Sequence, residues 1–136
     1  MKIEHAAFQV ADPVSLAEWY VEHLGMTVKR SQSVAPFGHF LADDGDAVML
    51  EFYNNPKVTV PDYRATDPFV LHLAFQTDDV AHTRDRLIAA GATPEGEVQV
   101  TDAGDHVAML RDPSGLALQL VRRTSPMIPE GPRTTP

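Results

Sequence analysis

Hydrophobic and polar residues alternate in two stretches that open with related motifs. In residues 3–10, one face would carry Ala6, Phe8 and Val10 and the other His5, Ala7 and Gln9. In residues 70–77, Leu71, Leu73 and Phe75 alternate in the same way with His72, Ala74 and Gln76. Period-two alternation of this kind predicts a half-buried β-strand in each stretch.

A helix is predicted after each of these strands. Asp12 is a good N-cap, and Pro13 suits the first helical position because its missing N–H costs nothing there. Gly25 ends the first helix as a C′ glycine, and the second runs from near Asp79 to Gly91. The apolar stripe of the first helix consists of Leu16, Ala17, Tyr20 and Leu24, and we place Trp19 and Tyr20 in the core.

Three shorter strands are predicted after each helix. In the first half they are Met26–Ser33, Gly38–Asp43 and Ala47–Tyr53, and in the second half Pro94–Val100, His106–Arg111 and Leu116–Arg122. The last two are joined by Asp112-Pro113-Ser114-Gly115, which has the residue pattern of a type I turn. Each half is therefore a βαβββ unit, and the predicted fold class is α+β.

The two halves read as copies of one unit. His5-Ala6-Ala7-Phe8-Gln9 recurs as His72-Leu73-Ala74-Phe75-Gln76, 67 positions later, and Asp12 and His39 match Asp79 and His106 at the same offset. We expect one domain over residues 1–122, made of repeats 1–54 and 69–122. Asn54 to Asp67 should form an irregular surface connector, and the proline-rich tail, residues 124–136, should be extended or disordered.

Composition narrows the class of protein. With 136 residues, 43% hydrophobic and 22% charged, the chain fits one soluble globular domain. The net charge of −8 argues against nucleic-acid or anionic-membrane partners, and no run of 18 apolar residues predicts a membrane span. The chain has no cysteine and its start shows no signal peptide, so we expect a cytoplasmic protein.

Polar residues on the second face of the strands suggest a binding site. His5 and His72 lie at equivalent repeat positions, while Glu51 and Gln119 interrupt apolar fourth strands 46 and 47 residues later. Because an unpaired buried carboxylate is costly, Glu51 should meet water or a cation. Two imidazoles, a carboxylate and an amide oxygen suit a divalent first-row metal, so these four residues are the candidate ligands.

These features resemble the vicinal oxygen chelate superfamily, which includes glyoxalase I, bleomycin-binding proteins and extradiol dioxygenases. The resemblance covers residues 1–122 and includes Trp19-Tyr20-Val21-Glu22-His23-Leu24-Gly25-Met26 and Asp112-Pro113-Ser114-Gly115-Leu116-Ala117-Leu118-Gln119-Leu120. It implies a cupped mixed sheet with helices on its outer face, a homodimer, and a divalent metal ion (Ni, Co, Mn, Fe or Zn) held by His5, Glu51, His72 and Gln119. The substrate would be a small oxygenated molecule.

Gln119 departs from the family pattern, in which metal-dependent members usually carry Glu. An amide can supply an oxygen ligand but cannot act as a general base near neutral pH, which argues against classical glyoxalase I activity. Glu51 would then be the catalytic carboxylate, with the metal acting as a Lewis acid. Two function classes stay open: a metal-dependent lyase, isomerase or dioxygenase, and a metal-free protein that binds or sequesters a small molecule.

Overall fold

The computed structural model describes residues 1–128 and divides them into two compact units. Unit 1 is Met1–Ala65 with Pro113–Gly115, and unit 2 is Thr66–Asp112 with the chain from Leu116 onward. Unit 1 contains β1 (His5–Gln9), α1 (Pro13–Leu24), β2 (Thr27–Ser31), β3 (His39–Ala42), β4 (Met49–Tyr53) and a 3-10 turn at Tyr63–Ala65. Unit 2 contains β5 (Leu73–Gln76), α2 (Val80–Ala89), β6 (Thr93–Val100), β7 (His106–Arg111) and β8 (Ala117–Arg122). The predicted α+β fold of two tandem βαβββ modules is confirmed.

Each unit has a four-stranded mixed sheet of the same topology. The strand order is β1-β4-β3-β2 in unit 1 and β5-β8-β7-β6 in unit 2. In both, the first strand pairs in parallel with the fourth, and the other pairs are antiparallel. Ala7 pairs with Glu51 just as Ala74 pairs with Gln119. The sequence repeat is thus a repeat of strand register, and it places Glu51 and Gln119 at equivalent positions.

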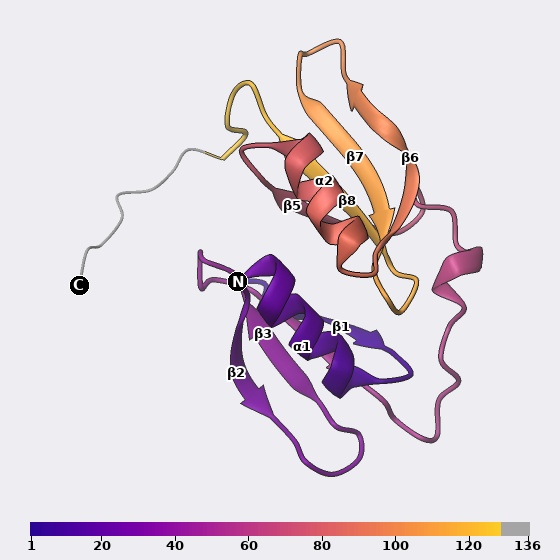
Figure 1. Cartoon of the computed structure of the whole chain (residues 1–136). Helices are drawn as coiled ribbons and strands as arrows, with labels where there is room; N and C mark the ends of the chain where they lie inside the picture. Colours follow the sequence, from indigo (N-terminus) through magenta and orange to yellow (C-terminus); the bar gives the residue numbers. More distant parts are fainter. Residues whose placement is uncertain (129–136) are drawn as a thin grey trace. The chain divides into compact units, whose positions relative to one another are not determined.

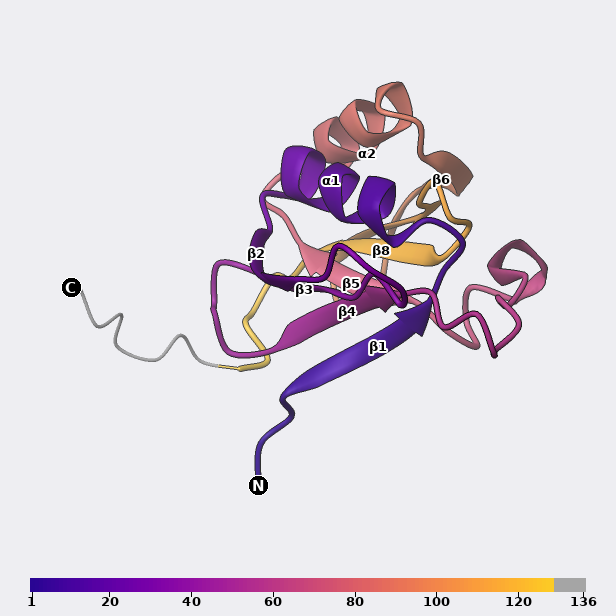
Figure 2. The ribbon, with the colours of Figure 1, turned by 90° about the horizontal axis from the view of Figure 1, so that it is seen from below.

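The helix ends follow the residues that predicted them. The carboxylate of Asp12 accepts from the backbone N–H of Ser15, and that of Asp79 from the N–H of His82. Gly25 ends α1 in the left-handed conformation (φ 70°) and donates its N–H to the carbonyl of Tyr20. Figures 1 and 2 show α1 lying across one face of its sheet. Each helix therefore leaves the opposite face of its sheet uncovered by helix within its own unit.

The core of each unit lies between helix and sheet. In unit 1 the ring of Tyr20 packs on that of Phe52 with centroids 4.7 Å apart, and both side chains are fully buried. Trp19 is 8% exposed, so the prediction that both aromatic residues of α1 belong to the core is confirmed. In unit 2 the fully buried leucines are Leu87, Leu110, Leu116, Leu118 and Leu120. Burying each large apolar side chain contributes about 1.5–3 kcal/mol to folding.

The connector between the repeats is more ordered than an irregular surface link. Its 3-10 turn buries Tyr63, whose hydroxyl donates to the carbonyl of Gln9 over 2.9 Å. The amide nitrogen of Gln9 donates to the carbonyls of Asn55 and Val58, and its amide oxygen accepts from the N–H of Asn55. Part of the connector is therefore fastened to the end of β1, a contact that local sequence pattern does not reveal.

The ends of the described chain complete the fold. Thr124 is held by Asp105, which accepts from both its backbone N–H and its hydroxyl. No helix or strand follows Arg122 among the described residues, and the rest of the predicted tail, residues 129–136, lies outside them. No helix within residues 1–128 has the length and apolar character needed to cross a membrane.

Candidate functional site

His5 and Glu51 meet on the face of the unit 1 sheet that α1 does not cover. His5 begins β1, and Glu51 lies in β4 opposite Ala7, whose small side chain leaves room between them. His5 Nε2 lies 3.4 Å from Glu51 Oε2, and Glu51 is 18% exposed while His5 is 37% exposed. Because Phe52 packs against α1, period-two alternation turns Glu51 to the other side, towards His5. The two predicted unit 1 ligands are thus adjacent and reachable from solvent.

Two neighbours fix the imidazole of His5. Its Nδ1 contacts the carboxylate of Glu4, and its ring stands edge-on to Phe40 with centroids 5.5 Å apart. A carboxylate on the far ring nitrogen orients a histidine and makes it a better ligand through the other nitrogen. His5 therefore presents Nε2 on the side where Glu51 lies.

A loop that sequence analysis did not single out closes over Glu51. Gly38 is buried and donates its N–H to the side-chain oxygen of Gln32 over 3.2 Å. A Cβ added at Gly38 would lie 3.0 Å from that oxygen and 3.4 Å from Glu51 Oε1. Glycine thus lets the backbone approach the carboxylate closely. The only local signal in the sequence is the glycine itself.

In unit 2, His72 lies immediately before β5. Its Nδ1 donates to the carbonyl of Pro68 over 2.7 Å, which places the proton on Nδ1 and leaves the lone pair on Nε2. That tautomer suits a metal ligand or a hydrogen-bond acceptor. His72 is half-buried. Its ring is oriented by a backbone carbonyl just before the strand, whereas the ring of His5 is oriented by a carboxylate.

Gln119 lies in a hollow of about 370 Å³ on the unit 2 sheet. It pairs with Met109 of β7 and shares the hollow with Pro68 and Phe69. The hollow also carries carboxylates with cationic partners: Glu95 contacts Arg111, and Glu97 lies 3.3 Å from Arg84. Gln119 therefore lies in a concave surface that combines apolar side chains with the carboxylates of Asp67, Glu95 and Glu97, the last two of which have cationic partners.

The geometry of the unit 1 pair fits half of a metal site. Two nitrogen or oxygen ligands at 2.0–2.2 Å from one ion lie about 2.8–3.6 Å apart for cis-octahedral or tetrahedral angles. The 3.4 Å between His5 Nε2 and Glu51 Oε2 falls in that range. Among residues 1–128, no group of three or more His, Asp or Glu side chains is placed to hold an ion. The structure thus brings together His5 and Glu51 in one unit and places His72 and Gln119 in the other.

One sequence interpretation needs correction, and one residue has a role that the sequence did not indicate. Gln9 alternates to the same side of β1 as His5, but it is 6% exposed and its side chain donates to the connector backbone. His39 and His106 are not structural counterparts, because Phe40 pairs with Glu51 where Met109 pairs with Gln119. The turn before β4, residues 43–48, is one residue longer than that before β8, residues 112–116, which contributes to this mismatch. Both histidines alternate away from the face of Glu51 or Gln119.

Comparisons with known proteins concern the family and the fold. The family model of the Glyoxalase/Bleomycin resistance protein/Dioxygenase superfamily matches residues 2–120. The crystal structure of SMU.1112c is 32% identical, with 90% of this chain and 98% of that chain covered and a TM-score of 0.69. A search of curated proteins found no match to the chain.

Two further structures share the fold at lower identity. Glyoxalase I from Zea mays is 23% identical with a TM-score of 0.72, and the match covers 91% of this chain but 45% of the maize enzyme. TnmS3, an antibiotic binding protein from Streptomyces sp. CB03234, is 21% identical with a TM-score of 0.68, covering 91% of this chain and 97% of that one. With the family model covering nearly the whole fold, the chain belongs to the Glyoxalase/Bleomycin resistance protein/Dioxygenase superfamily.

Proposed function

We propose that the chain is a glyoxalase-like metalloprotein that acts as a lyase or isomerase on a small oxygenated substrate. The observation that carries this proposal is the His5–Glu51 pair, 3.4 Å apart on the sheet face that α1 does not cover. Its counterparts His72 and Gln119 occupy the equivalent positions of the second repeat. We assign all four side chains as ligands of a divalent metal ion of the first transition row.

Each residue would have a distinct part in the chemistry. His5 and His72 are oriented by Glu4 and by the Pro68 carbonyl, so each directs Nε2 outward as a ligand. When bound, the metal supplies a Lewis acid that polarises a substrate carbonyl. Glu51 is the proton acceptor because Gln119, an amide, cannot take up a proton near neutral pH. The proton would move to Oε1 or Oε2 of Glu51.

A second candidate function is metal-free binding of a small molecule. It is favoured by Gln119, which replaces a carboxylate with a neutral amide inside the 370 Å³ hollow of unit 2. Hollows of this volume are in the range used by small organic ligands. In this case the histidines would be hydrogen-bonding groups rather than ligands of an ion.

Metal content separates the two candidates. The full chain is purified without chelators, analysed for Ni, Co, Mn, Fe and Zn, and then titrated with each ion by calorimetry. We expect one ion per site, with affinity lowered at least tenfold in His5→Ala, Glu51→Gln and His72→Ala. His106→Ala is the matched control, because its side chain lies off the Gln119 face, and it should bind as the wild type does.

Two outcomes would contradict the metal assignment. One is a wild-type protein that takes up none of these ions, and the other is uptake that the three substitutions leave unchanged. In the first case the search turns to small-molecule binding. A chain that binds the ion is then assayed with carbonyl substrates, with lyase, isomerase and oxygenase products distinguished by mass spectrometry.

A further inference from the structure

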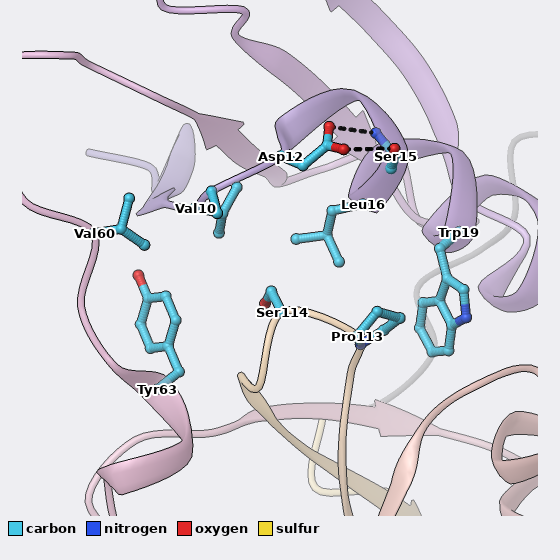
Figure 3. A pocket seen from close by; sticks show the side chains of 10 residues that line it. Val10, Asp12, Ser15, Leu16, Trp19, Val60, Tyr63, Pro113 and Ser114 are labelled. Atoms are coloured by element: carbon cyan, nitrogen blue, oxygen red, sulfur yellow. Dashed lines mark hydrogen bonds between the residues drawn. The ribbon is translucent and has the colours of Figure 1, made fainter.

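A second cavity lies in unit 1, away from the His5–Glu51 pair. It has a volume of about 480 Å³ and is bordered by the end of β1, the first two turns of α1, the connector and the Pro113–Gly115 turn (Figure 3). Val10 lies on the β1 face that packs under α1, whereas His5 and Glu51 project from the other face. The cavity is therefore distinct from the site assigned above.

Most of its wall is apolar and rigidly held. Val10, Leu16, Trp19 and Tyr63 line it and are each less than 9% exposed. Tyr63 is fixed by its hydrogen bond to the Gln9 carbonyl, so this wall does not depend on a ligand for its position. Figure 3 shows Leu16 and Tyr63 directed into the space from opposite sides. A volume of 480 Å³ with such a wall is in the range of small-molecule pockets.

One charged group lies at the rim of this apolar space, with both of its oxygens bonded to Ser15. Among the lining residues the carboxylate of Asp12 is the single ionisable acid, and none of them is Lys, Arg or His. The backbone N–H of Ser15, followed by its hydroxyl, holds the pKa of Asp12 below its ordinary value, so the group is anionic at neutral pH. Its two hydrogen bonds to Ser15 leave further lone pairs, because a carboxylate has about four acceptor sites.

We propose that this cavity binds a small organic cation, an amine with an aromatic or alicyclic body. The apolar body would fill the space between Leu16, Trp19 and Tyr63, and the ammonium group would lie against the carboxylate of Asp12. Binding here needs neither a metal nor the residues of the His5 face, so this proposal can be tested independently of the proposed function.

The test uses two probes that differ in charge and share their shape. The uniformly ¹⁵N-labelled full chain is titrated with 2-phenylethylamine and with 2-phenylethanol, and backbone amide shifts are followed by NMR. We expect the amine to shift amides of residues 10–19, Val60, Tyr63 and Ser114, and to bind at least tenfold more tightly than the alcohol. Equal affinity for amine and alcohol would overturn the assigned ligand class.

The repeat supplies a matched pair of variants. Asp12→Asn keeps an N-cap acceptor while removing the charge, so α1 should persist. It should weaken amine binding at least tenfold and leave alcohol binding unchanged. Asp79→Asn makes the same change at the N-cap of α2, a residue that does not line the cavity, and should alter neither.

A third variant tests the cavity rather than its charge. Ser114 lies in the turn at the cavity border, and Ser114→Trp should fill the space and abolish binding of both probes. The proposal is wrong if no amide shifts with about 10 mM amine, a concentration that detects very weak binding. It is also wrong if the shifts map to the His5 face, or if Asp12→Asn binds the amine as the wild type does.

Discussion

The two units share a strand register but use equivalent residues differently. Gln9 and Gln76 occupy the same place in the repeated pentapeptide. Gln9 is buried and hydrogen-bonded to the connector backbone, whereas Gln76 is exposed. The same position of the repeat thus binds the connector backbone in unit 1 and is exposed to solvent in unit 2. Identity across a repeat predicts backbone placement, and the surrounding chain decides the role.

The fourth strands of the two units, β4 and β8, also carry equivalent residues with different surroundings. Glu51 and Gln119 have nearly the same shape and equivalent pairing partners, Ala7 and Ala74. Glu51 lies 3.4 Å from an imidazole nitrogen, while Gln119 lies among apolar and acidic side chains. In the proposed metal site, unit 1 would therefore supply a charged oxygen and unit 2 a neutral one.

The largest expected effect concerns Gln9. Gln9→Ala removes four hydrogen bonds and leaves the part-buried carbonyls of Asn55 and Val58 without their donor, so we expect a loss of about 2–3 kcal/mol in the free energy of unfolding. Gln76→Ala, on the exposed counterpart, should change stability by about 0.5 kcal/mol or less. Urea unfolding followed by circular dichroism measures both, and equal losses would remove the contrast between the units.

The next effect concerns the charge of the two half-sites. Glu51→Gln gives unit 1 the amide of unit 2 and should lower divalent-metal affinity by roughly 10–100-fold. Gln119→Glu makes the reverse exchange and should raise it, because a carboxylate is a stronger ligand than an amide. Calorimetric titration with Co²⁺ measures both.

The control for this exchange is Glu22→Gln, an exposed residue of α1 that should leave the affinity unchanged. Affinity that responds to neither Glu51→Gln nor Gln119→Glu would show that the two fourth strands do not bind the ion.

A smaller effect is expected at Tyr63. Tyr63→Phe keeps the buried ring but removes the hydroxyl that donates to the Gln9 carbonyl, which should cost about 1 kcal/mol of unfolding free energy. Tyr53→Phe is the matched control, since the half-buried hydroxyl of Tyr53 makes no hydrogen bond with residues 1–128. Thermal unfolding can rank the two variants, and a greater loss at Tyr53 would contradict the role given to the connector.

The smallest effect is a pH dependence at Asp105 of unit 2. The backbone N–H of Thr124, followed by the guanidinium of Arg123, holds the pKa of Asp105 below its ordinary value of 3.8. Its stabilising contribution is therefore present at neutral pH and lost as the pH falls below about 4. Asp105→Asn should narrow the stability difference between pH 7 and pH 3.

Asp102 provides the control for this measurement. It is exposed in the same loop and makes no hydrogen bond or ion pair with the described residues, so Asp102→Asn should keep the wild-type pH profile. If Asp105→Asn also keeps that profile, the hydrogen bonds to Thr124 and Arg123 do not contribute through ionisation.

Local pattern and the repeat were enough to predict most of the fold. Asp12 and Gly25 bound α1 as expected because capping depends on neighbouring residues. The cost of burying an unpaired carboxylate also singled out Glu51, which lies 3.4 Å from His5. What could not be predicted depends on residues far apart in the chain. Tyr63 meets Gln9 across 54 positions, and nothing near Tyr63 indicates that partner.

The candidate site was predictable to a lesser extent. The sequence located His5 and Glu51 but not Gly38 and Gln32, which act through a loop whose path no periodicity describes. The apparent match of His39 with His106 failed because a fixed offset cannot follow turns of unequal length. A fixed sequence offset identifies equivalent residues of the two repeats within one strand, but not beyond a loop whose length differs between the repeats.

The parallel pairing of first and fourth strands also bears on how the chain folds during synthesis. β1 finds its partner only when β4 has been made, since His5 pairs with Met49, and β5 must wait likewise for β8. Contacts between such distant residues require closure of a long loop and slow the folding reaction. During synthesis, the first strand of each half would therefore stay unpaired until the fourth strand of that half has been made.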